Sequence, residues 1–377
     1  MARGFADSQE APPLVTVAIP TRNRARMLQG CLDSVLGQAF TSIEVYVSDN
    51  ASTDDTEKVM TGYDDARLRY SRLEEDIGLW GNLSRCLRLG DAPYVVVLPD
   101  DDLMLPGNLE PQVRLLERHP SLGFAHSAFS LIAAQDQVLV PYANWLDGPV
   151  EEVESGRDYI ARSFRTHTRA LLASSVIRRA TIGGNRFEEE DGPPADQGFF
   201  LRIALSSDVG YVDRVLVACR VHEGSQTSRL TGARARGDAY TASFDQVLND
   251  RLVKERFLEQ HLGREDLRVL KPRRWARRAM VAVTVRASVE ETSNRAARRA
   301  AWRMLREATR IDRLVAIHPR SIVLMVASVA GLGGLRLYFR TGVAAQDMWS
   351  RLRRGARALT ARGDAPAVGT ASRRGGG

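Results

Sequence analysis

The sequence predicts an α/β fold with a mixed sheet flanked by helices, followed by an Arg-rich helical C-terminal region. Between residues 14 and 98, short apolar runs alternate with amphipathic segments, a pattern typical of parallel strands joined by helices. The runs LVTVAI and YVVVL are apolar throughout, as expected of strands buried on both faces. After residue 228, apolar residues recur at helical spacing among many arginines.

The first half of the sheet is predicted from four strands, at residues 14–19, 43–48, 67–73 and 94–98. Helices are expected between them, near residues 26–37, after Asp54 and near residues 79–89. The strands at 14–19 and 94–98 should lie at the centre of the sheet, because they carry no polar face.

The remaining elements follow Pro106. Residues 108–119 predict a helix, and residues 123–140 predict one or two strands. Further strands are expected at 169–178 and 209–220, with helices near 156–164 and 197–206. No internal repeat is visible, which excludes solenoids and propellers.

The length predicts more than one structural unit, because single cores stop growing at about 250 to 300 residues. Within the 377 residues we expect a flexible lead at 1–13, an α/β domain at 14–228 and a helical accessory region at 229–350. Residues 351–377 are Arg, Ala and Gly rich and predict a disordered basic tail.

Charge is distributed unevenly: residues 1–230 carry a net charge of −10 and residues 231–377 carry +17. A basic region attracts nucleic acid, anionic lipid or phosphorylated ligands. Because no nucleic-acid-binding motif is present, we favour peripheral membrane contact over nucleic acid. The apolar segment at 321–335 is too short to span a bilayer, which takes about 18 residues or more. A soluble subdomain that closes a cleft or forms a homo-oligomer stays open.

The cysteines and the N-terminus indicate the compartment. Cys31, Cys86 and Cys219 are odd in number and widely spaced, which fits neither a disulfide framework nor a CxxC zinc cluster. The first residues lack the apolar region of a secretory signal. We therefore expect a cytoplasmic protein, with the cytoplasmic face of the membrane as the place of any peripheral contact.

The acidic run Asp100, Asp101 and Asp102 is the strongest chemical signal. It directly follows a buried strand, where parallel sheets present ligands. Three adjacent carboxylates repel one another unless a cation neutralises them, and Mg²⁺ or Mn²⁺ prefers such oxygen ligands together with substrate phosphates. A solvated turn that caps the next helix is the alternative for any acidic loop.

Two other loops follow predicted strands at the same edge of the sheet. Asp49 ends the second strand, where its carboxylate could accept a hydrogen bond from a nucleobase, although capping of the next helix explains part of this loop. The loop PTRNR after the first strand replaces the GxGxxG turn of dinucleotide-binding enzymes, which excludes that class. The Gly-rich, Lys-bearing phosphate loop expected of sugar-phosphate nucleotidyltransferases is also absent, so that class remains a distant alternative.

The ordered motifs TVAIPTRNR, EVYVSDNASTDDT, GLWGNLSRCL, YVVVLPDDDLMLP and VACRVHEGSQTS resemble family-two inverting glycosyltransferases. The resemblance covers residues 14–228 and implies a GT-A type, Rossmann-like mixed sheet with a DxD-like metal motif. It implies transfer of a sugar from a UDP-, dTDP- or GDP-linked donor to a hydroxyl of a glycan or lipid-linked acceptor. A catalytically silent glycan- or nucleotide-binding relative is the alternative.

The resemblance also implies roles for individual residues. The nucleotide-sugar donor would contact Pro20, Thr21, Asn23, Asp49, Asn82, Asp100, Asp101 and Arg220. The cofactor Mn²⁺ or Mg²⁺ would be held by Asp102 and His222. His126 alternates with apolar residues, so we interpret it as a strand position outside the site.

The general base is expected at Asp196, in the stretch PPADQGFFLRIA. This stretch departs from the family pattern, because Ala195 stands where Glu is frequent and Gly198 where a second Asp is frequent. A residue among 188–191, the acidic run EEED, is the alternative base. A base is needed because an acceptor hydroxyl is a poor nucleophile until its proton is removed.

Overall fold

The computed structural model describes residues 11–143, 152–165, 170–192 and 195–222, and short pieces at 235–236, 239–240, 253–254, 256–257, 260–261 and 306. The chain divides into two compact units, Met1–Val283 and Thr284–Gly377. Nearly all of the predicted accessory region, the apolar segment at 321–335 and the basic tail lie outside the described residues. The predicted boundary near residue 228 stays a prediction.

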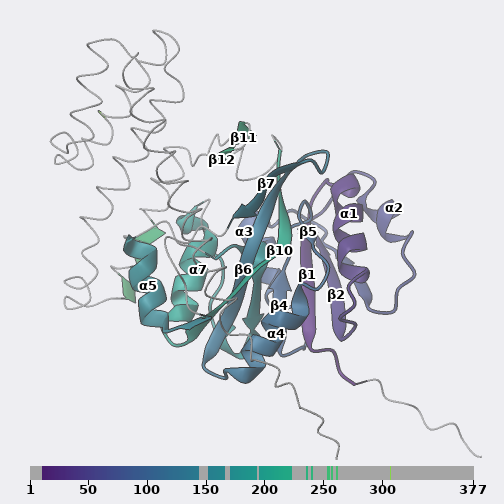
Figure 1. The fold of residues 1–377 in the computed structure, drawn as a ribbon. Coiled ribbons are helices and arrows are strands. Elements are labelled where there is room, and N and C mark those ends of the chain that lie inside the picture. The colour runs from purple at the N-terminus through teal and green to yellow at the C-terminus, as the bar shows by residue number, and fades with distance from the viewer. Residues whose placement is uncertain are drawn as a thin grey trace, which may run out of the picture. The chain divides into compact units, whose positions relative to one another are not determined.

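A mixed sheet forms the centre of the first unit, with strand order β3-β2-β1-β4-β9-β6-β10-β5 (Figure 1). β3, β2, β1 and β4 run parallel, β9 runs against both β4 and β6, and β10 is parallel to β6. Two short additions pair at the side, β7 with β6 and β8 with β10. The strands are β1 Val15–Thr21, β2 Ile43–Asp49, β3 Leu68–Arg72, β4 Tyr94–Val97, β5 Leu103–Met104, β6 Leu122–Ala133, β7 Val138–Ala143, β8 Val153–Glu154, β9 Ser175–Arg178 and β10 Asp208–Val221.

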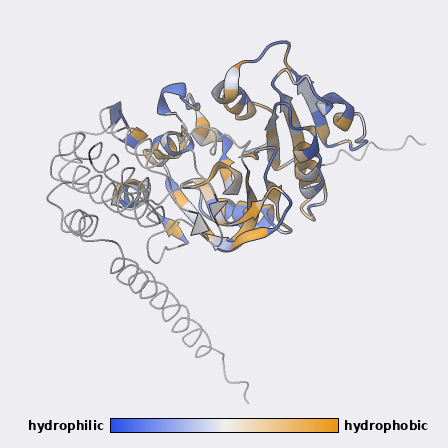
Figure 2. Ribbon diagram, turned by 90° about the horizontal axis from the view of Figure 1, so that it is seen from above, coloured by the Kyte–Doolittle hydropathy of each residue, from blue (hydrophilic) through white to orange (hydrophobic). Residues whose placement is uncertain are grey.

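Helices cover both faces of this sheet. The helices are α1 Ala25–Leu36, α2 Thr56–Met60, α3 Gly78–Cys86, α4 Leu109–Arg118, α5 Gly156–Arg165, α6 Arg179–Ile182 and α7 Ala195–Ala204. α1 and α4 pack on one face with alternate residues of the central strands, and α3, α5 and α7 pack on the other. The helices show hydrophobic and hydrophilic stretches in turn, as helices that cover a sheet must (Figure 2).

The central strands confirm the predicted architecture. β1 and β4 lie side by side in the middle of the sheet. Val17 and Ile19 belong to one core cluster while Ala18 belongs to the other, so β1 is buried on both faces. His126 lies in β6 with 1% of its surface exposed, as a strand position rather than a ligand.

Several short elements were not predicted. β5, β8, α6 and two 3-10 turns, Leu172–Ser174 and Glu189–Asp191, span only two to four residues each. A further two-stranded pair joins β11 Ala235–Arg236 and β12 Ala239–Tyr240. The expected strand at 169–178 is shorter, because a 3-10 turn precedes β9. Such segments are too short to show a hydrophobic period, so only their tertiary neighbours define them.

Residues after 250 contribute to the core of the first unit. Phe257 is 2% exposed and its ring lies 6.3 Å from that of Phe164. Lys254 donates from Nζ to the carbonyl of Ser163 at 2.7 Å.

In the part of the chain that the structure describes, no helix is long and apolar enough to cross a membrane.

Candidate active site

The strand pairing brings three loops to one edge of the sheet. Parallel pairing sets Thr21, at the end of β1, opposite Asp49, at the end of β2. β4 runs parallel to β1 on its other side and leads directly into the acidic run. β5 then pairs antiparallel with β10, which places the end of β10 against the acidic run. Ligands in such sheets bind at this edge, so the geometry marks the candidate site.

The three carboxylates of the acidic run are buried, with Asp100 3%, Asp101 8% and Asp102 8% exposed. Thr21 donates from Oγ1 to Asp100 Oδ2 at 2.6 Å, which ties the end of β1 to the run. A solvated turn would leave these side chains in water. The burial therefore favours a ligand-binding role over the turn alternative.

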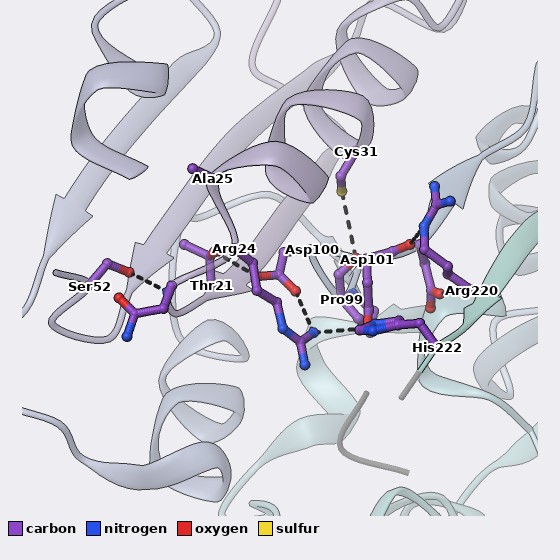
Figure 3. Close-up of polar contacts among 12 residues, drawn as sticks. Thr21, Arg24, Ala25, Cys31, Ser52, Pro99, Asp100, Asp101, Arg220 and His222 are labelled. Carbon is purple, nitrogen blue, oxygen red and sulfur yellow. Dashed lines mark hydrogen bonds and ion pairs between the residues drawn. The ribbon is translucent and has the colours of Figure 1, made fainter. Parts of the chain in front are cut away.

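Arg24 and His222 surround Asp101 (Figure 3). Arg24 Nη1 lies 2.8 Å from Asp101 Oδ2 and 3.0 Å from Asp100 Oδ1. His222 Nε2 lies 3.0 Å from the same Asp101 Oδ2. One carboxylate oxygen thus faces both a guanidinium and an imidazole.

Arg220 fixes the acidic run to the rest of the sheet. Its backbone N–H donates to Asp102 Oδ1 at 2.8 Å, and its Nε donates to the carbonyl of Asp101 at 2.8 Å. Its Nη1 donates to the carbonyl of Ala133 and to Asp136 Oδ1 at the turn between β6 and β7. These contacts position the run, and the predicted contact of Arg220 with the donor stays a prediction.

Burial and mutual repulsion set the ionisation of the run. Burial, with the charge of Asp101, raises the pKa of Asp100 to about 6 and that of Asp102 well above its usual value. Burial also acts to raise the pKa of Asp101, but the hydrogen bond from His222 and the charge of Arg24 outweigh it and lower that pKa. Asp100 and Asp102 thus resist ionisation because they are buried beside another carboxylate, and a bound cation would relieve this repulsion by replacing their protons.

Asp49 is fully buried and accepts two hydrogen bonds. The backbone N–H of Ser52 donates to Oδ1 at 2.8 Å, and the hydroxyl of Tyr70 donates to Oδ2 at 2.6 Å. The first contact is the turn capping expected from the sequence. The second fixes the orientation of the carboxylate, and its role toward a nucleobase stays a prediction.

The loop after β1 is held by the loop after β2. Asn23 has a φ of 54°, a left-handed conformation that asparagine tolerates better than most residues. Its N–H donates to Ser52 Oγ at 2.9 Å, and its Oδ1 accepts from the N–H of Thr53 at 2.7 Å. Pro20 is buried within β1. These hydrogen bonds hold the loops after β1 and β2 together.

Asn82 lies on the buried face of α3, toward β2. It is 4% exposed, donates from Nδ2 to the carbonyl of Ser48 at 2.9 Å and accepts from Ser48 Oγ at 2.5 Å. These bonds anchor α3 on β2. Contact of Asn82 with donor hydroxyls stays a prediction.

Asp196 occupies the first turn of α7, as the sequence predicted for the base. It is only partly buried, and the N–H of Gln197 donates to its Oδ1 at 2.9 Å. Among the alternative bases, Asp191 is 5% exposed and pairs with Arg202 at 3.1 Å and Arg256 at 3.4 Å. Glu189 and Glu190 are exposed.

The residues present fit a hard divalent cation. An imidazole nitrogen, His222 Nε2, lies within hydrogen-bond distance of Asp101, and burial beside Asp101 raises the pKa of Asp102, as expected of crowded carboxyl groups that a cation would stabilise. Among the described residues, no three His, Cys, Asp or Glu side chains form a ready-made metal cage. Mg²⁺ and Mn²⁺ commonly use one or two carboxylates and complete their shell with substrate phosphates, so a full cage is not required.

Sequence reasoning missed Arg24 and Cys219. Arg24 lies in the loop after β1, and the acidic run follows the neighbouring parallel strand β4. Predicting that β1 and β4 pair could therefore have placed Arg24 next to the acidic run. Burial raises the pKa of the Cys219 thiol, and the nearby charges of Asp102 and Asp101 raise it further. Its position could be foreseen only from the pairing of β5 with β10.

Residues 16–175 match the family model described as Glycosyl transferase family 2, and these residues include the loops after β1, β2 and β4. Across 244 residues the chain is 33% identical to an uncharacterized protein of Mycobacterium tuberculosis, covering 59% of this chain and 72% of that protein. The chain belongs to glycosyl transferase family 2. The family resemblance and the enzyme class predicted from the motifs are thereby confirmed: this family 2 member is a glycosyltransferase.

A second relative of this family 2 protein has a named activity. It is the GalNAc(5)-diNAcBac-PP-undecaprenol beta-1,3-glucosyltransferase of Campylobacter jejuni, 28% identical over 182 residues. That alignment covers 47% of this chain and 56% of the relative, so the chain spans about half the length of that enzyme.

Solved structures show the same fold. TarS residues 1–349 of S. aureus in complex with UDP-GlcNAc matches with a TM-score of 0.53 at 18% identity, covering 87% of this chain and 92% of that one. The mannosyltransferase PcManGT of Pyrobaculum calidifontis with GDP-Man and Mn²⁺ matches with a TM-score of 0.51 at 16% identity, covering 85% and 88%. The predicted GT-A type sheet of this family 2 protein is confirmed.

Proposed function

We propose that this protein is an inverting, metal-dependent glycosyltransferase that moves a sugar from a nucleotide-diphosphate sugar to an acceptor hydroxyl. The observation that carries the proposal is the buried acidic run at the end of β4, joined to the ends of β1 and β10 by Thr21, Arg24, Arg220 and His222. Three crowded, buried carboxyl groups at the ligand-binding edge of the sheet suit a metal-bound diphosphate.

Asp102 and His222 are proposed to hold Mn²⁺ or Mg²⁺, which when bound supplies positive charge that stabilises the departing diphosphate. Asp100 and Asp101, with Thr21, form the part of the crevice that receives the donor. Asp49 is proposed to accept a hydrogen bond from the nucleobase, its orientation fixed by Tyr70. Pro20 and Asn23 shape the neighbouring wall, Asn82 holds α3, and Arg220 holds the acidic run in place.

Asp196 is proposed to take the proton from the acceptor hydroxyl as that oxygen attacks the anomeric carbon. Attack opposite the leaving diphosphate forms one C–O bond and breaks the other in a single displacement, which inverts the anomeric centre. The partial exposure of Asp196 suits contact with an incoming acceptor. Asp191 is less suited, because its carboxylate is buried and already pairs with Arg202 and Arg256.

The deciding experiment measures donor binding and sugar transfer separately. UDP-, GDP- and dTDP-linked sugars are tested with Mn²⁺, using thermal stabilisation for binding and product formation for transfer. Asp102→Ala should lose metal-dependent donor binding, whereas Asp196→Ala should keep binding and lose transfer by about 10²- to 10⁴-fold. Glu117→Ala, at an exposed position of α4, is the control and should behave as wild type.

Other results of these binding and transfer assays would change the proposed base, activity or stereochemistry. Full transfer by Asp196→Ala would refute the base assignment, and loss of transfer in a variant among residues 188–191 would move it there. Donor binding without any transfer by the wild type would identify a catalytically silent relative. Product NMR that shows retention of the anomeric configuration would contradict inversion.

We propose a lipid-linked or cell-surface glycan as the acceptor. The Campylobacter jejuni relative is named for an undecaprenol-linked acceptor, which supports this class. A Bacillus subtilis relative named as a putative teichuronic acid biosynthesis glycosyltransferase supports the wider class of cell-surface glycans. Peripheral contact with the cytoplasmic face of the membrane would bring the site close to such an acceptor.

A further inference from the structure

Arg24 places a permanent positive charge inside the acidic run. Its Nη1 lies 3.0 Å from Asp100 Oδ1 and 2.8 Å from Asp101 Oδ2, and only 20% of its side chain is exposed. Figure 3 shows the guanidinium between the two carboxylates. The charges of both carboxylates outweigh the effect of burial and raise the pKa of Arg24. A guanidinium does not lose its proton in proteins, so this charge leaves the run only when the side chain moves.

The same carboxylate oxygen also meets His222. Asp101 Oδ2 lies 2.8 Å from Arg24 Nη1 and 3.0 Å from His222 Nε2. The nitrogen that would bind a cation thus already contacts a carboxylate that Arg24 neutralises. A divalent cation that enters here meets a guanidinium within a few ångströms, and like charges at such distances repel strongly in a buried site.

The backbone of Arg24 is anchored separately from its side chain. Its backbone stands at the N-terminal end of α1, where its carbonyl accepts from the N–H of Leu28 at 3.0 Å. The long side chain reaches from this fixed point across to the acidic run. Rotation about its side-chain bonds would withdraw the charge while the helix stays in place.

We propose that Arg24 is a positioning residue that competes with the divalent cation for the acidic run, so that the cation binds tightly only together with a nucleoside diphosphate. The diphosphate adds negative oxygens that bind the cation and also attract the displaced guanidinium. Arg24 thereby couples metal binding to donor binding. This inference rests on the proposed function, since it requires a metal-dependent donor site.

The test measures Mn²⁺ binding by electron paramagnetic resonance, first with Mn²⁺ alone and then with UDP, GDP or dTDP. Wild type should bind Mn²⁺ weakly alone and far more tightly with the matching nucleotide. Arg24→Met should bind Mn²⁺ alone at least about tenfold more tightly, because the competing charge is gone. The gain in Mn²⁺ affinity on adding nucleotide should shrink in proportion.

Three further variants make the test specific. Arg24→Lys keeps the charge and should resemble wild type, and Arg24→Gln should repeat the effect of Arg24→Met. Arg26→Met removes an exposed arginine two residues away and should change nothing. Thermal unfolding without metal checks that each variant is folded, and a folded Arg24→Gln suffices if Arg24→Met is not.

Two outcomes would overturn the inference in different ways. If wild type shows nucleotide-dependent Mn²⁺ binding but neither neutral variant binds Mn²⁺ alone more tightly, Arg24 does not compete and the proposed function stands. If wild type binds no Mn²⁺ with any of the three nucleotides, metal dependence fails and this inference fails with it.

Discussion

At the scale of single residues, the site is a set of buried charges that satisfy one another. Asp101 is held by Arg24 and His222, while Asp102 accepts from the backbone of Arg220. Such a network is costly unless every member has a partner, because burial removes the charges from water. The acidic run is therefore positioned before any ligand binds.

His126 is a buried titratable group away from the site, and it gives a pH prediction. Burial, with the charge of Arg162, lowers its pKa to about 3 from the ordinary value of 6.5. Between these values the unfolded chain binds a proton that the folded chain does not, so stability falls as pH falls below 6.5. The loss should be about 1.4 kcal/mol per pH unit.

Denaturant unfolding of wild type and His126→Phe at pH 7 and pH 5 tests this sign. Ring neighbours Phe124, Tyr159 and Tyr211 suit an aromatic replacement. Wild type should lose about 2 kcal/mol more than the variant between the two values. Equal losses in both proteins would show that His126 does not carry the pH dependence.

At the scale of elements, the first turn of α7 departs from the family pattern for a steric reason. A Cβ atom at Gly198 would lie 2.2 Å from Asp191 Oδ2. Asp191 thus fills the space of a side chain at this position and pairs there with Arg202 of the same helix. The family's frequent second Asp cannot be accommodated while Asp191 stays in place.

Gly198→Ala should therefore destabilise the protein by about 1 to 3 kcal/mol, because the new methyl group overpacks a buried ion pair. Sugar transfer should fall as well, since the same turn carries Asp196. Gly184→Ala is the matched control, because a Cβ there meets nothing within 4 Å. A Gly198→Ala protein as stable as the control would contradict the steric account.

At the scale of the whole molecule, charge separates the chain into an acidic part at residues 1–230, with −10, and a basic part at residues 231–377, with +17. The acidic part contains the α/β sheet and the candidate site. An anionic membrane is attracted to the basic part of the chain. A donor diphosphate is also negative, so its binding in the acidic part requires the divalent cation proposed above.

The full chain should bind vesicles that contain anionic phospholipid, and binding should weaken as salt is raised. Neutral phosphatidylcholine vesicles serve as the control and should not bind. Co-sedimentation measures the bound fraction, and a mobility-shift assay with double-stranded DNA runs in parallel. Binding to DNA but not to anionic vesicles would replace the membrane proposal with a nucleic-acid one.

The sequence by itself determined the order of the longer strands and helices and the residue types that follow the strands. Continuous apolar runs marked β1 and β4 as central, and parallel pairing then required the loops that follow them to meet. Hydrophobic periodicity and the residues that directly follow a strand are local properties, so both can be read from the sequence without the tertiary structure. The burial of the acidic run was not determined in this way, because a solvated turn was also compatible with its place after β4.

Tertiary structure alone decided which side chains meet across the chain. The pairing of the two-residue strand β5 with β10 sets Arg220 and His222 against the acidic run, although more than 100 residues separate them. The bridge from Arg24 and the contact between Asp191 and Gly198 likewise depend on packing. The sequence shows no local pattern for such contacts, because the residues that form them are far apart along the chain and meet only when it folds.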